Sequence, residues 1–379
     1  MLPFRYALRN LVRRPLRTAL TLVGLGAIAL LVVLTTGFAT GLDASVVGSA
    51  RDDVAIVGGV SGDTDLVRSF LALGAAHEVA GGVPGVLVIG GRRAASIELH
   101  TMSRIGDRVG LLRGVTPEAY LVRPAVVAID GHEPRAPFEL FVGRLAGARL
   151  GVSDAALATG RTLRLEGRDW TISGHFAAPG TVLEAETWGR LEDVMTAAGR
   201  VDVSCVALRL TDAAAFGRIR LYEMEHPKLE ISTMRETELF EAFRRTLTPV
   251  SLLARVMAVL VLIGGIFGCA NTMLAAVLAR TREMGALRAV GYGPLAVGVS
   301  LLEESLLLGA LGGMIGFTAA SLVGEIPLRF PAGAFVLDLG ATSKLTGLVA
   351  ALAAGLVGGL FPAWRAIRQP LPDALGGKL

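Results

Sequence analysis

The chain has 379 residues, of which 52% are hydrophobic, 18% are charged and 48 are glycine, and its formal net charge is +4. A soluble protein usually carries about 25% charged residues, so charge must be missing from particular parts of this chain. The composition excludes a disordered, collagen-like or disulfide-rich protein.

Four long stretches of the sequence contain no charged residue. They are residues 18–41, 256–279, 305–324 and 345–364, which are 24, 24, 20 and 20 residues long. About 20 apolar residues are enough to cross the hydrocarbon core of a bilayer as an α-helix. The sequence therefore predicts an α-helical membrane protein with four transmembrane helices, plus a large extracytoplasmic α+β domain inserted between helices 1 and 2.

These stretches divide the chain into nine predicted segments. The first stretch is longer than the ~7–15 residue core of a secretion signal, so we interpret it as a membrane helix. In order, the segments are a cytoplasmic amphipathic N-terminal helix (1–17), transmembrane helix 1 (18–42), the extracytoplasmic (periplasmic) domain (43–249), transmembrane helix 2 (250–279), a cytoplasmic coupling loop or helix (280–294), transmembrane helix 3 (295–324), an extracytoplasmic loop (325–344), transmembrane helix 4 (345–364) and a cytoplasmic tail (365–379).

Basic residues give the predicted orientation of the chain. Residues 43–249 hold 23 basic and 27 acidic residues, and the rest holds 14 basic and 6 acidic, so the two parts carry −4 and +8. Because Lys and Arg beside membrane helices stay in the cytoplasm, we expect both termini there. The basic N-terminal helix either lies on the cytoplasmic surface of the membrane, or its charges only keep the N-terminus in the cytoplasm and have no further role. The predicted outer domain has no stripe of Lys and Arg with interleaved aromatic residues, which is the pattern that would indicate nucleic-acid binding.

The region 43–249 alternates between short apolar runs and amphipathic stretches, which is typical of an α+β domain, here in one or two lobes. Leu163 and Leu165, followed by Trp170 and Ile172, alternate around a predicted hairpin turn. The expected strands are 54–57, 86–89, 125–129, 162–165, 170–173, 203–210 and 230–232, and the expected helices are 65–73, 190–198, 213–226 and 235–247.

The sequence contains no familiar catalytic or metal-binding motif. Its five histidines are scattered, and Cys205 lies in the predicted outer domain whereas Cys269 lies in predicted helix 2, so the two cysteines do not pair. There is no GxSxG nucleophile motif and no GxxxxGK[ST] phosphate loop. We expect no catalytic residue, no metal site and no cofactor in this chain. Its energy must then come from another polypeptide or from an ion gradient.

Glycines recur at spacings of three and four within the predicted membrane helices. Small residues allow helix backbones to approach closely in a bilayer. We therefore expect helix packing at Gly24, Gly264, Gly268, Gly309, Gly312, Gly313, Gly316, Gly355 and Gly359.

Residues 280–294 (RTREMGALRAVGYGP) form a second notable segment. A short helix here would place Met284, Leu287 and Val290 on one side, and Gly291 begins a stop signal. The segment is either an ordinary charged loop or an amphipathic helix that docks to a partner, and only a docking helix needs an apolar side.

The longer segment NTMLAAVLARTREMGALRAVGYGP, residues 271–294, resembles the signature of the FtsX/MacB-type permeases of ATP-binding-cassette (ABC) transporters. Three further segments resemble the same family, in the same order. They are YALRNLVRRPLRTALTLVGL at 6–25, LLEESLLLGALGGMIG at 301–316 and FPAWRAIRQPLPDAL at 361–375. Together the four segments cover nearly all of the predicted membrane portion.

The resemblance implies several partners. Two permease chains, identical or homologous, would pair among membrane lipids in the bacterial cytoplasmic (inner) membrane, and separate ABC ATPase subunits would bind ATP and Mg beneath them. A periplasmic adaptor protein is a further possible partner. The resemblance also makes residues 280–291 the coupling helix, in which apolar anchors and charged contacts meet the ATPase through Arg280, Arg282, Glu283, Met284, Leu287, Arg288 and Gly291.

One acidic position also follows from the resemblance. The family has an acid at the position of Glu303, near the cytoplasmic surface, where it could pair with Arg282 or Arg288. A membrane carboxylate is otherwise a candidate for proton coupling. We favour the structural ion pair at Glu303.

The function implied is that of a permease subunit and not of an enzyme. It would couple ATP hydrolysis by a separate ATPase to export or extraction of a lipid, lipoprotein, peptide or small hydrophobic molecule, by mechanotransmission. The alternative is a non-transporting scaffold that activates an extracytoplasmic cell-wall hydrolase. An ion-coupled transporter ranks third, because only Glu303 and Glu304 titrate within the predicted helices and no inverted repeat is evident.

Overall fold

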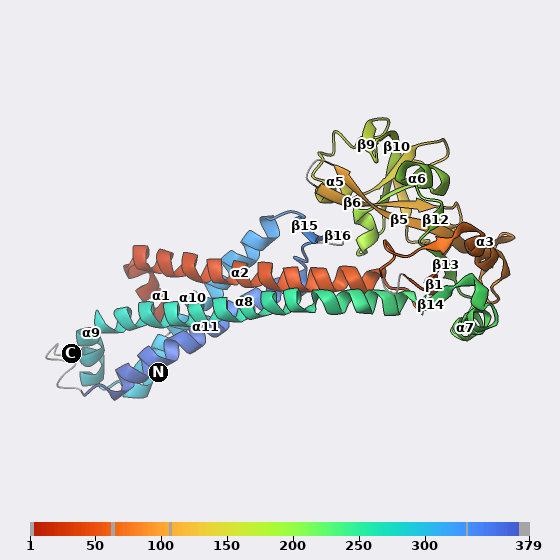
Figure 1. Cartoon of the computed structure of the whole chain (residues 1–379). Helices are drawn as coiled ribbons and strands as arrows, with labels where there is room; N and C mark the ends of the chain where they lie inside the picture. The colour runs from red at the N-terminus through yellow and green to blue at the C-terminus, as the bar shows by residue number, and fades with distance from the viewer. Residues whose placement is uncertain (1–3, 62–64, 106–107, 331–332, 371–379) are drawn as a thin grey trace. The chain divides into compact units, whose positions relative to one another are not determined.

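The computed structural model describes residues 4–61, 65–105, 108–330 and 333–370 (Figure 1). Residues 1–3 of the predicted N-terminal helix and 371–379 of the predicted tail lie outside this description. The chain forms two compact units. The helical unit is Met1–Thr40, Pro249–Ile326 and Leu337–Leu379, and the mixed unit is Gly41–Thr248 with Pro327–Val336.

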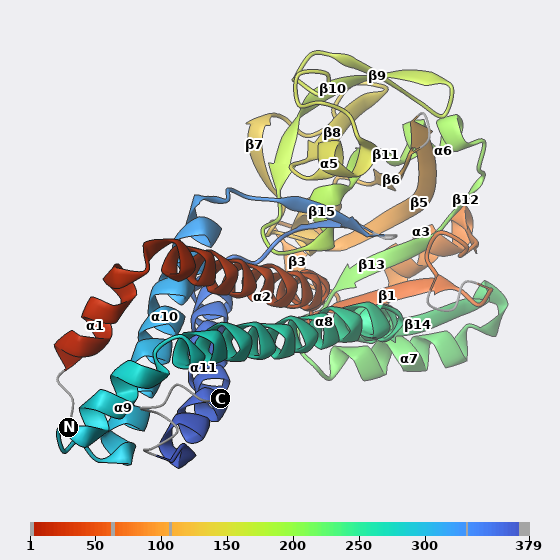
Figure 2. The same cartoon turned by 90° about the vertical axis from the view of Figure 1, so that its left-hand side faces the viewer.

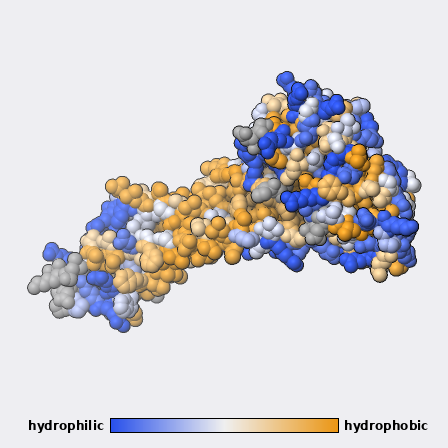
Figure 3. Space-filling view, viewed as in Figure 1, coloured by the Kyte–Doolittle hydropathy of each residue, from blue (hydrophilic) through white to orange (hydrophobic). Residues whose placement is uncertain are grey.

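Four helices are long and apolar enough to cross a membrane, and each overlaps one predicted transmembrane segment. They are α2 (Pro15–Ser49), α8 (Glu236–Leu278), α10 (Pro294–Leu322) and α11 (Ala341–Arg368). On the face drawn in Figure 3, hydrophobic residues cover most of this helical surface. The chain is therefore a multi-pass membrane protein with a mixed α/β domain between its first two membrane helices, as the sequence predicts.

The N-terminal segment folds as a separate short helix. Helix α1 spans Phe4–Arg13, and α2 begins at Pro15. Proline is tolerated in the first turn of a helix because its missing N–H has no intrahelical partner there. The chain therefore turns between the two helices, immediately before Pro15.

Glycines on α10 bring this helix close to α11 and α2. A Cβ added to Gly309 would lie 2.8 Å from the carbonyl oxygen of Ala351 on α11. One added to Gly316 would lie 2.5 Å from the Cβ of Ala29 on α2. Real Cβ atoms do not approach so closely, so these backbones meet only because the side chains are absent. Predicted packing at Gly312, Gly313, Gly355 and Gly359 is of the same kind.

Three of the predicted packing glycines make no close contact with another element in the described part of the chain. Apart from its own stretch of helix, no described atom lies within 4 Å of a Cβ built on Gly24, Gly264 or Gly268, so the predicted packing is not made there between these helices. The contacts of α8 run instead through its neighbour Gly265, which meets Ile28 of α2. The three glycines lie on the outer side of their helices because helical periodicity separates adjacent residues by about 100°.

The mixed unit is built on one ten-stranded sheet rather than on separate lobes. In spatial order its strands are β14 (Ile231–Arg235), β1 (Val54–Gly59), β13 (Cys205–Arg209), β5 (Ala95–Ile105), β6 (Arg108–Val115), β11 (Thr187–Arg190), β8 (Glu139–Gly143), β10 (Arg168–Ala177) and β7 (Val127–Gly131), with β9 (Thr162–Leu165) paired to β10. Three short pairs complete the strands: β2 (Leu71–Ala72) with β12 (Asp202–Val203), β3 (Val88–Ile89) with β4 (Arg92–Arg93), and β15 (Pro327–Phe330) with β16 (Gly333–Val336).

Five short α-helices pack beside this sheet. Figure 2 shows α7 running along β14 and β1. Helices α5 and α6 contact β6, and α3 and α4 contact β5 and β13. Their bounds are α3 (Leu73–Gly82), α4 (Ala119–Val122), α5 (Ala146–Leu150), α6 (Leu191–Ala198) and α7 (Ala215–Glu225).

The predicted hairpin is confirmed and supplies part of the main core. Strands β9 and β10 pair with Leu165 opposite Arg168, and the turn between them has positive φ at Glu166 and Gly167. The alternating apolar side chains point inward, so that Trp170 is fully buried. Cys205 and Cys269 are both buried and free, in agreement with the prediction that they do not pair.

Two parts of the predicted secondary structure are wrong. The expected helix at 65–73 is absent, because the chain there forms turns and strand β2 before α3 begins at Leu73. The prediction also missed β5, β6, β8 and β11. Strands β5 and β6 place charged residues at buried positions, among them Glu98 and Arg113, which breaks the apolar pattern typical of a strand.

Gly316→Val should destabilise the helical unit. The new side chain would overlap Ala29 of α2, and overpacking of this kind costs about 1–3 kcal/mol. Gly24→Val, whose Cβ meets nothing within 4 Å, is the matched control. Thermal unfolding of the full chain in detergent measures both. Equal losses of stability in the two variants would contradict the packing role of Gly316.

Candidate functional site

The segment between α8 and α10 forms a helix, as the sequence predicts. Helix α9 spans Thr281–Ala289, and α10 begins at Pro294 (Figure 2). Between them Gly291 has φ +107°, a conformation that an L side chain rarely adopts. Glycine is therefore required at this turn, which stops α9 and sets the direction of α10.

The apolar side of α9 packs against the chain itself. Met284 is 7% exposed and belongs to a cluster with Val277, Val297, Leu301 and residues of α11, and Leu287 is half-buried against it. Met284 is thus unavailable as an apolar anchor for a partner, and that prediction is wrong. Helical packing explains the error, since the predicted apolar side serves to fix α9 to the membrane helices.

A different set of residues forms the exposed side of α9. Arg282 and Glu283 are exposed, as the prediction of a charged docking surface requires. The exposed apolar residues are Val290, 80% exposed, and Leu295 at the start of α10, 70% exposed. We call Arg282, Glu283, Val290 and Leu295 the α9 surface. Leu295 was not identified from the sequence because it follows the proline that begins the next helix.

Two of the predicted coupling arginines make contacts inside the chain. Arg288 donates through Nη1 to the backbone oxygen of Gln369, which follows α11, at 2.5 Å. Arg280 is 8% exposed and donates through Nη2 to Glu304 at 2.7 Å. These residues position α9 and do not belong to its exposed side.

Glu304, and not Glu303, forms the ion pair at this end of α10. Glu304 is 2% exposed and also lies 3.8 Å from Nη2 of Arg17. Its pairs join α2, α10 and the residue before α9. The predicted pair of Glu303 with Arg282 or Arg288 is wrong: within the described chain, Oε2 of Glu303 is buried and has no hydrogen-bond partner. Adjacent helical residues face different directions, so only one of the two acids can meet Arg280.

The mixed unit contains a second buried ion network, centred on Glu98. This side chain is fully buried in β5, and its two oxygens accept from Arg123 at 2.6 Å and from Arg113 at 2.7 Å. Burial by itself would raise the pKa of Glu98, but Arg123 and Arg113 hold it well below its usual value. Arg113 also donates two parallel hydrogen bonds of 2.7 Å to the two carboxylate oxygens of Glu186.

The same network reaches the ends of two membrane helices. Glu236, the first residue of α8, accepts from Nη2 of Arg123 at 3.0 Å. Its second oxygen accepts from the backbone N–H of Arg51, two residues beyond the end of α2, at 3.2 Å. The network of Glu98, Arg113, Arg123, Glu186 and Glu236, which we call the helix-end network, therefore ties α2 and α8 to the sheet.

Three residues of this region lie close enough to suggest a metal site, but their chemistry does not fit one. Ligand atoms of Glu98, His100 and Cys205 lie within 4.8 Å of one another. However, guanidinium groups already occupy both oxygens of Glu98, and Nε2 of His100 bonds to the same carboxylate. Burial also raises the pKa of the Cys205 thiol, which opposes formation of a thiolate ligand. The cluster is an ion-pair network.

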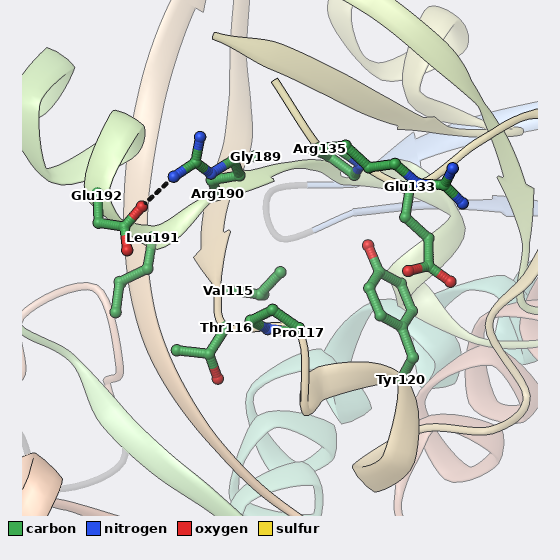
Figure 4. A pocket seen from close by; sticks show the side chains of 11 residues that line it. Val115, Thr116, Pro117, Tyr120, Glu133, Arg135, Gly189, Arg190, Leu191 and Glu192 are labelled. Carbon is green, nitrogen blue, oxygen red and sulfur yellow. Dashed lines mark hydrogen bonds and ion pairs between the residues drawn. The ribbon is translucent and has the colours of Figure 1, made fainter. Parts of the chain in front are cut away.

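A polar groove lies elsewhere in the mixed unit (Figure 4). It measures about 440 Å³ and lies between the end of β6, α4, the 133–135 loop and the start of α6. Arg190 donates a hydrogen bond to Glu192 on one side, and the hydroxyl of Tyr120 lies near Glu133 on the other and has no hydrogen-bond partner among the described residues. Burial raises the pKa of Tyr120, so this hydroxyl stays protonated at neutral pH.

Comparison with known proteins assigns the membrane part of the chain. Residues 255–371 match the FtsX-like permease C-terminal family model. The macrolide export ATP-binding/permease protein MacB of Acinetobacter baylyi is 29% identical over 170 residues, which are 44% of this chain and 26% of that protein. MacB of Hahella chejuensis is 30% identical over 186 residues, 47% of this chain and 28% of that protein. The aligned region is thus about a quarter of the length of these relatives.

Two solved structures are similar to the chain at low identity. The periplasmic region of MacB from Actinobacillus actinomycetemcomitans aligns with 52% of this chain and 94% of its own, at 11% identity and a TM-score of 0.37. The extracellular domain of the noncanonic ABC-type transporter YknZ aligns with 48% of this chain and all of its own, at 14% identity and a TM-score of 0.35.

The family match covers the membrane part of α8 together with α9, α10 and α11, which are the elements that carry the buried Glu304 pair and the α9 surface. Residues 255–371 thus carry an FtsX-like permease domain, and the chain is similar to MacB proteins over less than half of its length.

Proposed function

We propose that the chain is the permease subunit of an ABC transporter in the bacterial cytoplasmic membrane, with both termini in the cytoplasm. A separate ATPase subunit, which binds ATP and Mg, docks on the α9 surface. The observation that carries this proposal is the division of α9 into an anchored side and an exposed side with both charged and apolar groups. Such a surface suits a protein partner, because apolar contact supplies affinity and charge supplies orientation.

The anchoring of α9 suits it to transmit force. Its buried side packs on α10 and α11, Arg288 holds the end of α11, and the preceding Arg280 holds α10 and, through Glu304, α2. A displacement of α9 by the ATPase would therefore act on several membrane helices together. Because packed helices and paired charges resist deformation, the motion is passed on rather than absorbed.

The helix-end network provides the opposite end of this mechanical path. Helices α2 and α8 each contain residues of both compact units and end or begin at the network. A displacement of α2 and α8 would shift strands β5, β6 and β11 of the sheet, because Glu98, Arg113 and Glu186 link these strands by ion pairs. We propose that ATP-driven closure reshapes the outer domain in this way and exports or extracts a lipid, lipoprotein, peptide or small hydrophobic molecule at the outer face.

Two glycines of α8 support pairing of two permease chains. Gly264 and Gly268 make no close contact with another element among the described residues, and Leu260 and Phe267 beside them are 52% and 71% exposed. In a bilayer, small residues beside apolar ones allow two helices to pack closely. We propose that a second copy or a homologous permease covers this side, that membrane lipids cover the remaining apolar surface, and that a periplasmic adaptor protein engages the outer domain.

Val290→Asp should weaken ATPase binding at least tenfold. The change places a charge at Val290, the most exposed of the large apolar side chains of the α9 surface. Val201→Asp, at a valine 85% exposed in the mixed unit, is the control. Co-purification of the ATPase subunit with the full chain measures the effect. Retention of the ATPase by Val290→Asp at the control level would count against docking on α9.

Glu304→Gln should uncouple ATP hydrolysis from movement of substrate. The substitution leaves the buried Arg280 charge without its carboxylate, and breaking a buried pair costs about 3–5 kcal/mol. Glu303→Gln, which removes no ion pair found in the described chain, should cost less than about 1 kcal/mol. Unfolding in detergent and ATP turnover per molecule of labelled lipid released from proteoliposomes test this. A larger loss in Glu303→Gln would reverse the assignment.

Glu98→Gln should destabilise the mixed unit by about 3–5 kcal/mol at pH 7, because it leaves Arg113 and Arg123 buried beside a neutral group. The folded-state pKa of Glu98 is depressed, so its contribution is present above its unfolded pKa, about 4.3, and is lost only as pH falls towards the folded value. The difference from wild type should therefore persist from about pH 8 to pH 5 and shrink below that. Denaturant unfolding followed by tryptophan fluorescence measures it.

Glu118→Gln is the control for that substitution. Glu118 pairs with Arg92 where both side chains are partly exposed, and such pairs contribute about 0–1 kcal/mol. A loss of stability at Glu98 no greater than that at Glu118 would show that the buried network does not hold the unit together.

A further inference from the structure

A cavity lies between the sheet and the first turns of α8. It measures about 400 Å³, within the range of about 300–1,000 Å³ typical of small-molecule sites. Side chains of β5 and β6 line it together with side chains of α8 from Glu236 to Thr246, and all of the lining residues belong to the mixed unit. The cavity therefore has no part in the proposed ATPase docking.

More than half of the residues that line the cavity are apolar. Leu239, Phe240 and Phe243 of α8 contribute to it, together with apolar side chains of β1, β5 and β6. The ring of Phe243 also lies 6.1 Å from that of Phe330 in the β15–β16 hairpin, which continues the apolar surface beyond the cavity. Concave apolar surfaces of this kind, with a few polar groups around them, are typical of sites for small apolar molecules.

Contact with membrane lipid does not explain the apolar side chains of this part of α8. Residues 236–248 include five charged side chains, and the charge-free part of the helix begins only at residue 256. Charged side chains at this density are too costly to place in the hydrocarbon core of a bilayer. Phe240 and Phe243 therefore line a cavity that belongs to the part of the helix outside the membrane.

The charged groups of the described lining balance one another. They are three arginines and three acids, namely Arg113, Arg123, Arg149, Asp65, Glu186 and Glu236. Arg113 pairs with Glu186, which also attracts Arg149. Arg123 pairs with Glu236. The exposed Asp65 pairs with Arg68. Burial lowers the pKa of His100, the remaining titratable residue of the lining, so this side chain adds no charge at neutral pH.

We propose that the cavity binds an uncharged apolar molecule, held by hydrophobic contact along Phe240 and Phe243 of α8. A charged head of either sign would lose its hydration in the cavity and would find the opposite charges already paired. An uncharged hydrocarbon loses little hydration and gains free energy in proportion to the apolar area that it removes from water. The balance of charge in the lining thus selects against both anionic and cationic ligands.

The bound molecule would touch α8 close to the helix-end network. Phe240 is one turn beyond Glu236, whose carboxylate accepts a hydrogen bond from Arg123. Occupancy of the cavity therefore adds contacts between α8 and the sheet. The inference names a substrate class and rests on the proposed function for its role in transport. Binding itself does not require the ATPase, so a failure to bind and a failure to transport are distinguishable.

The test uses the full chain in phosphatidylcholine nanodiscs without the ATPase. Three photoreactive probes share a hexadecyl chain with a diazirine at its end and differ only in the head: hexadecanol, hexadecyl sulfate and hexadecyltrimethylammonium. Labelling of residues 236–246 is divided by labelling of residues 256–279 in the same sample, which corrects for the partition of each probe into the bilayer. We expect this ratio to be at least tenfold higher for hexadecanol than for either charged probe.

Two results would overturn the proposal. One is a ratio for hexadecyl sulfate or hexadecyltrimethylammonium that equals or exceeds the ratio for hexadecanol. The other is labelling by hexadecanol that is confined to residues 256–279, which would show that the cavity is closed to the probe or is covered by a second copy of the chain.

Two variants test whether the label lies in the cavity. Ala242→Trp fills part of the cavity and should lower labelling of residues 236–246 by hexadecanol at least tenfold, and Ala213→Trp, at an exposed alanine outside the lining, is its control. Phe243→Asp places a charge on the apolar side and should have the same effect, with Leu221→Asp of α7, 54% exposed, as its control. Thermal unfolding in detergent checks that each variant is folded. Equal labelling of a folded variant and its control would overturn the placement of the ligand.

Discussion

The complete burial of the Glu98 carboxylate is the constraint on which the arrangement of the mixed unit depends. Glu98 has no exposed surface, and an isolated charge in such a place would be far too costly to keep ionised. Arg113 and Arg123 compensate the charge of Glu98. Each of these buried arginines also pairs with a second carboxylate, so the network extends to Glu186 and Glu236. Compensation of one charge thus fixes strands of the sheet and the end of a membrane helix in a single arrangement.

The same constraint operates at the other end of the membrane helices. Glu304 of α10 is buried, and its partners are Arg17 of α2 and Arg280, the residue before α9. A buried pair is weak evidence of net stability but strong evidence of a defined geometry, since other arrangements leave a charge unpaired. Ionic contacts therefore fix these helices both near α9 and where they meet the mixed unit, while close glycine packing brings α10 against α2 and α11.

Much of the fold could be predicted because its signals are local. Runs without charge mark the four membrane helices, alternation around residues 166–167 marks the β9–β10 hairpin, and the spacing of Met284 and Leu287 marks α9. The local sequence pattern could not predict which residue pairs with each buried charged group, because these partners lie far apart in the sequence. Arg51 meets Glu236 across 185 positions and Arg123 meets it across 113. For the same reason the choice between Glu303 and Glu304 depended on which side of α10 faces Arg280.

We propose that a force applied at α9 reaches the helix-end network. Hydrogen exchange of the full chain, bound to the proposed ATPase subunit in nanodiscs, tests this most directly when it is compared without nucleotide and with a non-hydrolysable ATP analogue. The account predicts that nucleotide changes amide exchange both in residues 281–289 and in β5 and β6 around Glu98 and Arg113, and that Glu304→Gln abolishes only the second change. A nucleotide response confined to α9 in the unmodified protein would contradict it.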